Sequence, residues 1–249
     1  MTTPTTDKLS PPGALRLALE WRAPTEAAAS LILWPWLRRG ARGDGHSVLV
    51  LPGLAAGDGS TLLLRRYLRA QGWRPHAWRQ GLNLGPRHGV LEACLERLQR
   101  LHADAGRPIS LVGWSLGGVY SREMAKRMPQ AVRQVITLGS PAAGRGHASN
   151  ARRLYEFVSG ARAYAPELMA RLHEPVPVPC TSIYSRSDGI VDWRASLQPE
   201  GPSAQNIRVP ASHTGMGLNP VVLRLIAERL SRPEQDWQPH EGAPVCKAS

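Results

Sequence analysis

A five-residue stretch, Gly113-Trp114-Ser115-Leu116-Gly117, lies between two predicted regular elements and limits the folds that this chain can adopt. Residues 109–112 form a short apolar run that predicts a buried strand, and residues 116–128 have the spacing of a helix that ends before Pro129. A serine flanked by glycines at a strand-to-helix turn is typical of a nucleophile elbow, because a Cβ at the glycine positions would collide with the strand or the helix. The same stretch is also compatible with a plain glycine-rich turn that carries a bystander serine.

The rest of the chain alternates between short apolar runs and amphipathic segments. Strands are expected over residues 47–51, 74–78, 109–112, 132–138, 180–184 and 206–209. Helices are expected over residues 61–71, 88–104, 116–128 and 218–231. This alternation predicts an α/β fold in which a mostly parallel sheet has helices on both faces, within a single domain over residues 1–249.

Four further segments accompany this pattern. Residues 1–12 are rich in Thr and Pro and are expected to be disordered, and residues 232–249 are expected to form an extended tail. Residues 13–40 are expected to hold N-terminal helices, whose apolar stripe either packs on the domain, as such stripes usually do, or contacts a membrane or gates the substrate. Residues 141–178 form a long excursion with two helical patches, whose apolar side chains either line an acyl pocket or pack on the sheet.

An acid and a histidine follow Ser115 in the order that a serine triad on an α/β sheet requires. Asp188 lies in the turn directly after the predicted strand 180–184, and His213 lies in the loop before the last helix. Asp192 is the competing acid, although an aspartate at that position is also suited to cap a short helix over 193–198. We favour Asp188, so that His213 takes the Ser115 proton and Asp188 fixes the tautomer of His213.

Two backbone N–H groups are candidates for an oxyanion hole. The N–H of Leu116 lies at a helix start beside the nucleophile, and the N–H of Leu54 follows the first core strand. Trp114 flanks the nucleophile and is expected to bind the apolar part of a substrate. Asn83 and Arg87 lie in a loop after a strand, where either a substrate contact or a plain surface role is compatible with the sequence.

Charge and composition limit the classes of molecule that the protein is expected to bind. The formal net charge is +12, yet the arginines are scattered along the chain without a basic stripe interleaved with aromatic residues, so we expect no nucleic-acid partner. A mild preference for anionic surfaces or substrates is compatible with this charge. The longest apolar stretch, residues 27–37, is too short for a stable membrane span. Three irregularly spaced cysteines and the lack of a visible signal peptide predict a cytoplasmic protein, and the histidines show no metal-ligand spacing, so no metal is expected.

Taken together, these segments resemble the α/β-hydrolase superfamily in its lipase/esterase branch. The resemblance extends over residues 48–231, through the motifs Val48-Leu49-Val50-Leu51-Pro52-Gly53-Leu54, Gly113-Trp114-Ser115-Leu116-Gly117-Gly118, Tyr184-Ser185-Arg186-Ser187-Asp188-Gly189-Ile190-Val191 and Ser212-His213-Thr214-Gly215-Met216-Gly217. Many members carry His-Gly in the oxyanion loop, where this chain has Pro52-Gly53. The resemblance implies that residues 141–178 form a small helical cap, and that no cofactor is needed.

The expected function is therefore the cleavage of carboxylic esters, small-molecule or lipid, through an acyl-enzyme, with a preference for short to medium acyl chains. A thioesterase, an acyltransferase or a polyester depolymerase would use the same machinery. A protein of a different class, which binds a ligand or a membrane surface without catalysis, would have no need of Ser115, Asp188 and His213 together. The oligomeric state is left open by the sequence.

Overall fold

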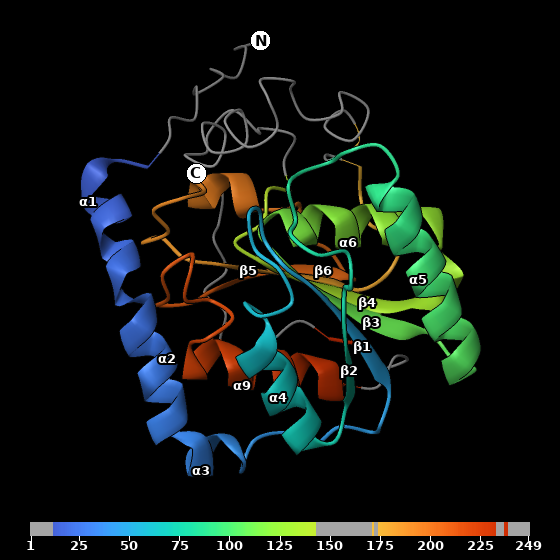
Figure 1. Ribbon diagram of the computed structural model, residues 1–249, viewed down its shortest axis with the longest axis horizontal. Coiled ribbons are helices and arrows are strands. Elements are labelled where there is room, and N and C mark those ends of the chain that lie inside the picture. The colour runs from blue at the N-terminus through green and yellow to red at the C-terminus, as the bar shows by residue number, and fades with distance from the viewer. Residues whose placement is uncertain (1–11, 143–170, 172–173, 233–236, 239–249) are drawn as a thin grey trace.

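The computed structural model describes residues 12–142, 171, 174–232 and 237–238 (Figure 1). The expected disordered segment 1–12 and the expected tail 232–249 therefore lie almost wholly outside the described residues, and so does most of the expected cap at 141–178.

A six-stranded sheet with the strand order β2-β1-β3-β4-β5-β6 forms the centre of the molecule. Every neighbouring pair of these strands is parallel, as the alternating pattern predicts. The strands are β1 Ser47–Leu51, β2 Arg74–Ala77, β3 Ile109–Trp114, β4 Val132–Leu138, β5 Cys180–Tyr184 and β6 Ala204–Arg208.

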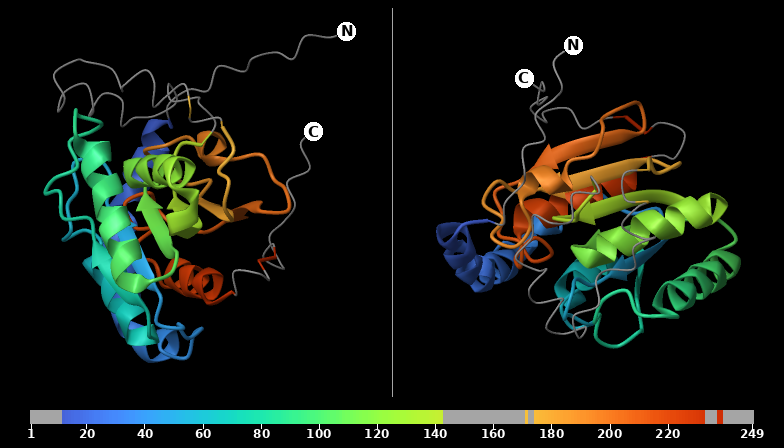
Figure 2. Two further views of the ribbon diagram at one scale, coloured as in Figure 1. Left: turned by 90° about the vertical axis from the view of Figure 1, so that its right-hand side faces the viewer. Right: turned by 90° about the horizontal axis from the view of Figure 1, so that it is seen from above.

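Helices cover both faces of the sheet (Figures 1 and 2). They include α4 Leu62–Gln71, α5 Val90–Ala105, α6 Leu116–Arg127 and α9 Pro220–Ser231. Side chains along each strand alternate between the two layers, so Val48 and Val50 pack with α4 and α9, whereas Leu49 and Leu51 pack with α5 and α6. Because both faces are covered, β1, β3 and β5 are buried along their whole length, which explains why apolar residues predominate in β1 and β3.

Short helical turns connect these layers. They are η2 Pro129–Ala131, which leads into β4, and η3 Trp193–Ser196, which follows β5. Among the described residues, no helix has both the length and the apolar composition that crossing a bilayer would require.

The N-terminal segment runs along one side of the molecule (Figure 1) as α1 Ala14–Ala18, η1 Leu19–Arg22, α2 Ala23–Ile32 and α3 Trp34–Leu37. Pro24 does not interrupt it, because proline is tolerated in the first turn of a helix. The prediction that the apolar stripe packs on the domain is wrong over most of the segment. The buried side chains of α2 are Glu26 and Ser30, whereas Leu15 and Leu31 are exposed.

Candidate active site

Ser115 occupies a strained turn between β3 and α6. Its φ of 52° and ψ of −119° lie outside the regions that L-residues usually adopt, and strain of this kind concentrates at functional sites. The turn is held by a hydrogen bond of 2.8 Å from the Ser115 N–H to the Leu138 carbonyl. A Cβ on Gly113 would overlap the backbone of α6, and a Cβ on Gly117 would overlap the backbone of Leu51, so both positions require glycine. These are the glycines by which the sequence predicted an elbow.

Asp188 and His213 are joined by a hydrogen bond of 2.7 Å between Asp188 Oδ2 and His213 Nδ1. The other carboxylate oxygen of Asp188 accepts the N–H groups of Ile190 at 2.8 Å and Val191 at 2.7 Å. These bonds leave Oδ2 directed at the imidazole, and both side chains are buried. Because His213 Nδ1–H donates to the carboxylate, Nε2 is the nitrogen left to accept a proton.

Electrostatics around His213 favour its protonated form. Burial lowers the pKa of this imidazole, but the charge and hydrogen bond of Asp188, with a further contribution from the charge of Glu20, leave it above its ordinary value. Gly139 makes room for the pair at the end of β4, where φ is +54°. A Cβ there would lie 2.9 Å from His213 Nδ1 and 3.0 Å from Asp188 Oδ2.

Asp192, the competing acid, has different partners. Its carboxylate accepts the Arg194 N–H at 2.8 Å at the start of η3 and lies 3.7 Å from the Arg194 guanidinium. This is the helix-cap role that the sequence allowed for it, and it leaves Asp188 as the carboxylate in contact with His213.

Ser115 and His213 line the same pocket, with a volume of about 270 Å³. The lining is largely apolar and consists of Gly53, Leu54, Ala56, Ser60, Trp114, Ser115, Ile190, His213 and Thr214. Trp114 Nε1 donates a hydrogen bond of 2.9 Å to the His213 carbonyl, so this residue both lines the pocket and supports the histidine loop. Leu116 follows Ser115 directly as the first residue of α6. The structure thus brings together Leu54, Trp114, Ser115, Leu116 and His213.

Asn83 and Arg87 do not contact this pocket. Asn83 is fully buried and its side-chain amide donates a hydrogen bond of 2.9 Å to the Pro52 carbonyl. Its own backbone pairs with Ala55 and Ala56, at 2.7 Å and 2.8 Å. Asn83 therefore holds the loop that carries Leu54, rather than a substrate, and Arg87 is exposed.

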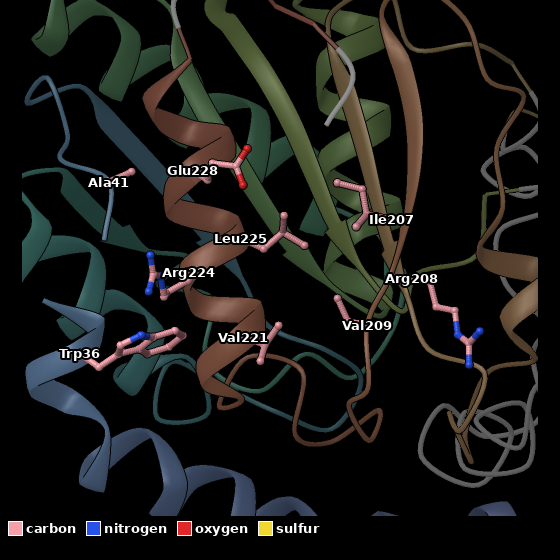
Figure 3. Close-up of a pocket in the computed structure, with 9 residues that line it drawn as sticks. All are labelled: Trp36, Ala41, Ile207, Arg208, Val209, Val221, Arg224, Leu225 and Glu228. Carbon is pink, nitrogen blue, oxygen red and sulfur yellow. The ribbon is translucent and has the colours of Figure 1, made fainter. Parts of the chain in front are cut away.

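A second pocket, of about 360 Å³, lies between α9, β6 and α3 (Figure 3). Apolar side chains of Ile207, Val209 and Leu225 line it, and Arg208 points away from it in Figure 3. The Arg224 guanidinium stacks over Trp36, 4.1 Å from the ring centroid. None of the predicted site residues lines this pocket, so we place the candidate site at Ser115.

Glu20 is the contact that sequence reasoning missed. Its carboxylate, in η1, accepts hydrogen bonds from the N–H groups of Gly189, His213 and Thr214, in the two loops that carry Asp188 and His213. No sequence motif marks Glu20, since the partners lie 169 to 194 residues further along the chain.

Comparison with known proteins places the fold. No family model matches the chain, and no curated protein matches it in sequence. Among solved structures, lipase B of Aspergillus fumigatus superposes with a TM-score of 0.56 at 17% identity, over 78% of this chain and 55% of that one. The chain therefore spans little more than half the length of that lipase.

Two other structures match over most of their length. An α/β-hydrolase enzyme from a sediment metagenome of the Mar Chica lagoon has a TM-score of 0.54 at 19% identity, over 75% of this chain and 90% of that one. The monoacylglycerol lipase of Paleococcus ferrophilus has a TM-score of 0.54 at 16% identity, over 77% and 96% of the two chains. Together with the parallel sheet and the elbow, these likenesses define the class: the chain has the α/β-hydrolase fold.

Proposed function

We propose that this chain is a serine hydrolase that cleaves carboxylic esters through an acyl-enzyme formed on Ser115. The observation that carries the proposal is the 2.7 Å hydrogen bond between Asp188 and His213, with His213 lining the same pocket as a serine in a strained elbow. A serine, a base and an orienting acid with these relations are the parts that nucleophilic acyl transfer needs.

In the first half of the reaction, Ser115 Oγ attacks the ester carbonyl carbon while its proton passes to His213 Nε2. The imidazolium is stabilised by Asp188, which stays ionised. The tetrahedral intermediate expels the alcohol, which takes the proton from Nε2, and the acyl group stays on Ser115. Water then reacts in the same way: it gives a proton to His213 Nε2 while its oxygen bonds to the acyl carbon. The carboxylic acid product leaves as Ser115 Oγ takes the proton back from Nε2.

The oxyanion of each tetrahedral intermediate needs donors that are already in place. We assign this role to the N–H groups of Leu116 and Leu54. Leu116 opens α6, where the helix dipole favours negative charge. Leu54 lines the pocket, and its neighbour Gly53 approaches the nucleophile so closely that a Cβ on it would lie 3.2 Å from Ser115 Cβ.

The apolar lining supports an acyl rather than a charged substrate. Leu54, Trp114 and Ile190 surround the nucleophile, in a pocket whose volume suits a short or medium acyl chain. Esters with such acyl groups are therefore the substrates to test first, with matched thioesters alongside to show whether the alcohol oxygen matters.

The test is hydrolysis of p-nitrophenyl esters of increasing acyl length, combined with labelling by a fluorophosphonate. Wild-type protein is expected to hydrolyse the shorter esters and to be labelled on Ser115, whereas Ser115→Ala loses both, with a fall in kcat of about 10⁴-fold or more. Ser60→Ala is the matched control, because Ser60 also lines the pocket but donates its hydroxyl to the Gly57 carbonyl at 2.8 Å. Labelling that survives in Ser115→Ala, or that disappears in Ser60→Ala, contradicts the assignment.

A further inference from the structure

A single carboxylate from the N-terminal segment holds both loops of the proposed acid and base. Glu20 Oε1 accepts the N–H groups of Gly189 at 2.8 Å and His213 at 2.9 Å. Glu20 Oε2 accepts the N–H and the hydroxyl of Thr214, each at 2.8 Å. The residue after Asp188 and the base itself are thus tied to the same side chain.

The neighbouring charged residues of the segment extend this contact. Glu26 accepts the N–H of Ser212 at 2.9 Å and its hydroxyl at 3.2 Å, and it forms an ion pair of 3.0 Å with Arg22. Arg22 also donates a hydrogen bond of 2.5 Å to the Ser187 hydroxyl. Residues on both sides of Asp188 and of His213 are therefore held by one helical segment.

The N-terminal segment and the two loops that carry Asp188 and His213 are tightly packed against each other. A Cβ on Gly189 would overlap the Arg16 carbonyl, and a Cβ on Gly215 would overlap the Glu26 carboxylate. Glycines at these positions let the two loops contact the N-terminal segment directly. A displacement of the segment would therefore also displace His213.

Glu20 also places a negative charge near His213, the proposed base. Partial burial raises the pKa of this carboxyl, but its hydrogen bonds from Thr214, His213 and Gly189 outweigh burial and leave the pKa below its ordinary value. Glu20 is therefore ionised at neutral pH. The charged groups that act on His213 are Asp188, from the loop after β5, and Glu20, from η1, while Arg22 and Glu26 contact the flanking serines.

We propose that Glu20 is a positioning residue for the proposed reaction, which sets the relative position of the acid and base loops and adds a second negative charge beside His213. The inference rests on the proposed function, because it assigns Glu20 a role through His213. It differs from a plain structural role, in which the carboxylate would stabilise the fold and leave the chemistry of His213 unchanged.

Glu20→Gln tests both parts of the role. The amide keeps the size of the side chain but loses the charge and one of the two acceptor oxygens. We expect kcat to fall by about 10- to 100-fold with KM little changed, because a misplaced base slows the chemical step. We also expect the acidic midpoint of the pH profile of kcat/KM to move down by about half a unit, since a negative charge that favours the protonated imidazole has been removed.

Two more variants separate position from charge and from folding. Glu20→Asp keeps the charge but shortens the reach, so its kcat is expected to fall while the acidic midpoint stays nearer that of the wild type. Glu96→Gln, an exposed position on α5, is the matched control and is expected to change neither quantity. Activity is normalised to the folded fraction, measured by thermal unfolding.

The titration of the His213 imidazole, followed by NMR, gives a readout that does not depend on turnover. A downward shift in its midpoint in Glu20→Gln supports the charge effect even for a protein that cleaves none of the tested esters. An active wild type whose Glu20→Gln variant keeps both kcat and the His213 midpoint overturns the inference and leaves the proposed function intact. A loss of activity that only follows the loss of folded protein, with an unchanged midpoint, also overturns it.

A second, independent feature of the N-terminal segment is its outward face, on the side away from the two loops. Large apolar side chains are exposed there, with Trp21 86%, Leu15 79%, Ile32 77% and Leu31 63% accessible. Between residues 13 and 42 the acidic residues are Glu20 and Glu26, and both are bonded to the loops on the inner side. The exposed apolar side chains of the segment therefore have no acidic side chain beside them on the outward side, and the exposed Arg38 and Arg39 follow directly after the segment.

A groove of about 540 Å³ continues this face between the N-terminal helices and α4. It is lined by Leu31, Trp34, Leu63, Arg66, Arg69 and Ala70. Apolar walls beside two guanidinium groups suit an acyl chain with an anionic headgroup, and exposed apolar patches of this kind commonly mark interaction sites. The net charge of +12 acts in the same direction.

From this charge complementarity we infer that the outward face of residues 15–32, with the adjoining groove, docks on an anionic lipid bilayer. The test is cosedimentation with vesicles of phosphatidylcholine that contain or lack phosphatidylserine. We expect binding to the anionic vesicles, weakened by salt and reduced about 10-fold or more in the double variant Trp21→Ser with Ile32→Glu. Leu82→Glu is the control, because Leu82 is 61% exposed but lies outside this face.

Absence of binding to anionic vesicles overturns this inference, and so does equal binding by the double variant. A dimer in solution that dissociates in the double variant, without vesicle binding by the wild type, would assign the face to a second copy of the chain instead.

Discussion

At the residue scale, two aspartates that follow β5, four positions apart, have different hydrogen-bond partners. Asp188 has one oxygen fixed by two backbone N–H groups and the other bonded to His213, whereas Asp192 caps η3. Both residues are buried, so burial does not distinguish them. What distinguishes them is the direction of the carboxylate, which is set by the N–H groups of Ile190 and Val191 and by the room that Gly139 leaves beside Asp188 Oδ2.

Substitution of each aspartate by asparagine tests this difference. Asp188→Asn is expected to lower kcat by about 10⁴-fold, because the amide no longer holds the required tautomer of His213. Asp192→Asn is expected to stay within a few-fold of the wild type, since asparagine caps a helix as well as aspartate does. Ester hydrolysis by the two folded variants checks this, and an Asp192→Asn variant as impaired as Asp188→Asn would contradict it.

At the scale of elements, the position of a cluster relative to the strands matters more than its residue types. Asp44, His46 and Ser110 form a second chain of serine, histidine and acid, with 2.5 Å between Asp44 Oδ1 and His46 Nδ1 and 2.8 Å between His46 Nε2 and Ser110 Oγ. It lies where β1 and β3 begin, at the opposite end of the sheet from Ser115. His46 and Ser110 are fully buried, so no substrate can reach the hydroxyl and the cluster is structural.

This cluster makes stability depend on pH. Burial lowers the pKa of His46 to about 4, even though the hydrogen bond and charge of Asp44 oppose it. Between this value and the ordinary value near 6.5 the unfolded chain binds more protons than the folded one, so the free energy of unfolding decreases as the pH falls through this range. We expect His46 to account for up to about 3 kcal/mol of this loss.

Urea unfolding between pH 4 and pH 7 measures the effect. His46→Gln is expected to be less stable at neutral pH but to show a weaker dependence on pH, because the titrating group is gone. His88→Gln, at an exposed position, is the control and should keep the wild-type dependence. An unchanged dependence in His46→Gln would rule out His46 as its source.

At the scale of the whole molecule, the N-terminal segment reverses the usual arrangement of an amphipathic helix. Its polar residues Glu20, Arg22 and Glu26 face the loops of the candidate site, whereas the large apolar residues between positions 15 and 32 are exposed. Only at its end do Trp34 and Leu37 pack against the core. This explains why periodicity was misleading here. A stripe of leucines reports that a helix has two faces, but not which of them meets the domain.

Local sequence patterns were enough to predict the parallel sheet, the elbow and the order of the candidate residues, because these features depend on interactions between neighbours in the chain. Alternation of apolar runs and helices predicts parallel strands, and the glycines around Ser115 predict a turn that no larger residue allows. The sequence favoured Asp188 but kept Asp192 as a competitor, and it was the folded arrangement that put Asp188 in contact with His213 and Glu20 against both loops. Those choices depend on the directions of side chains and on partners up to 194 residues apart, which no local pattern encodes.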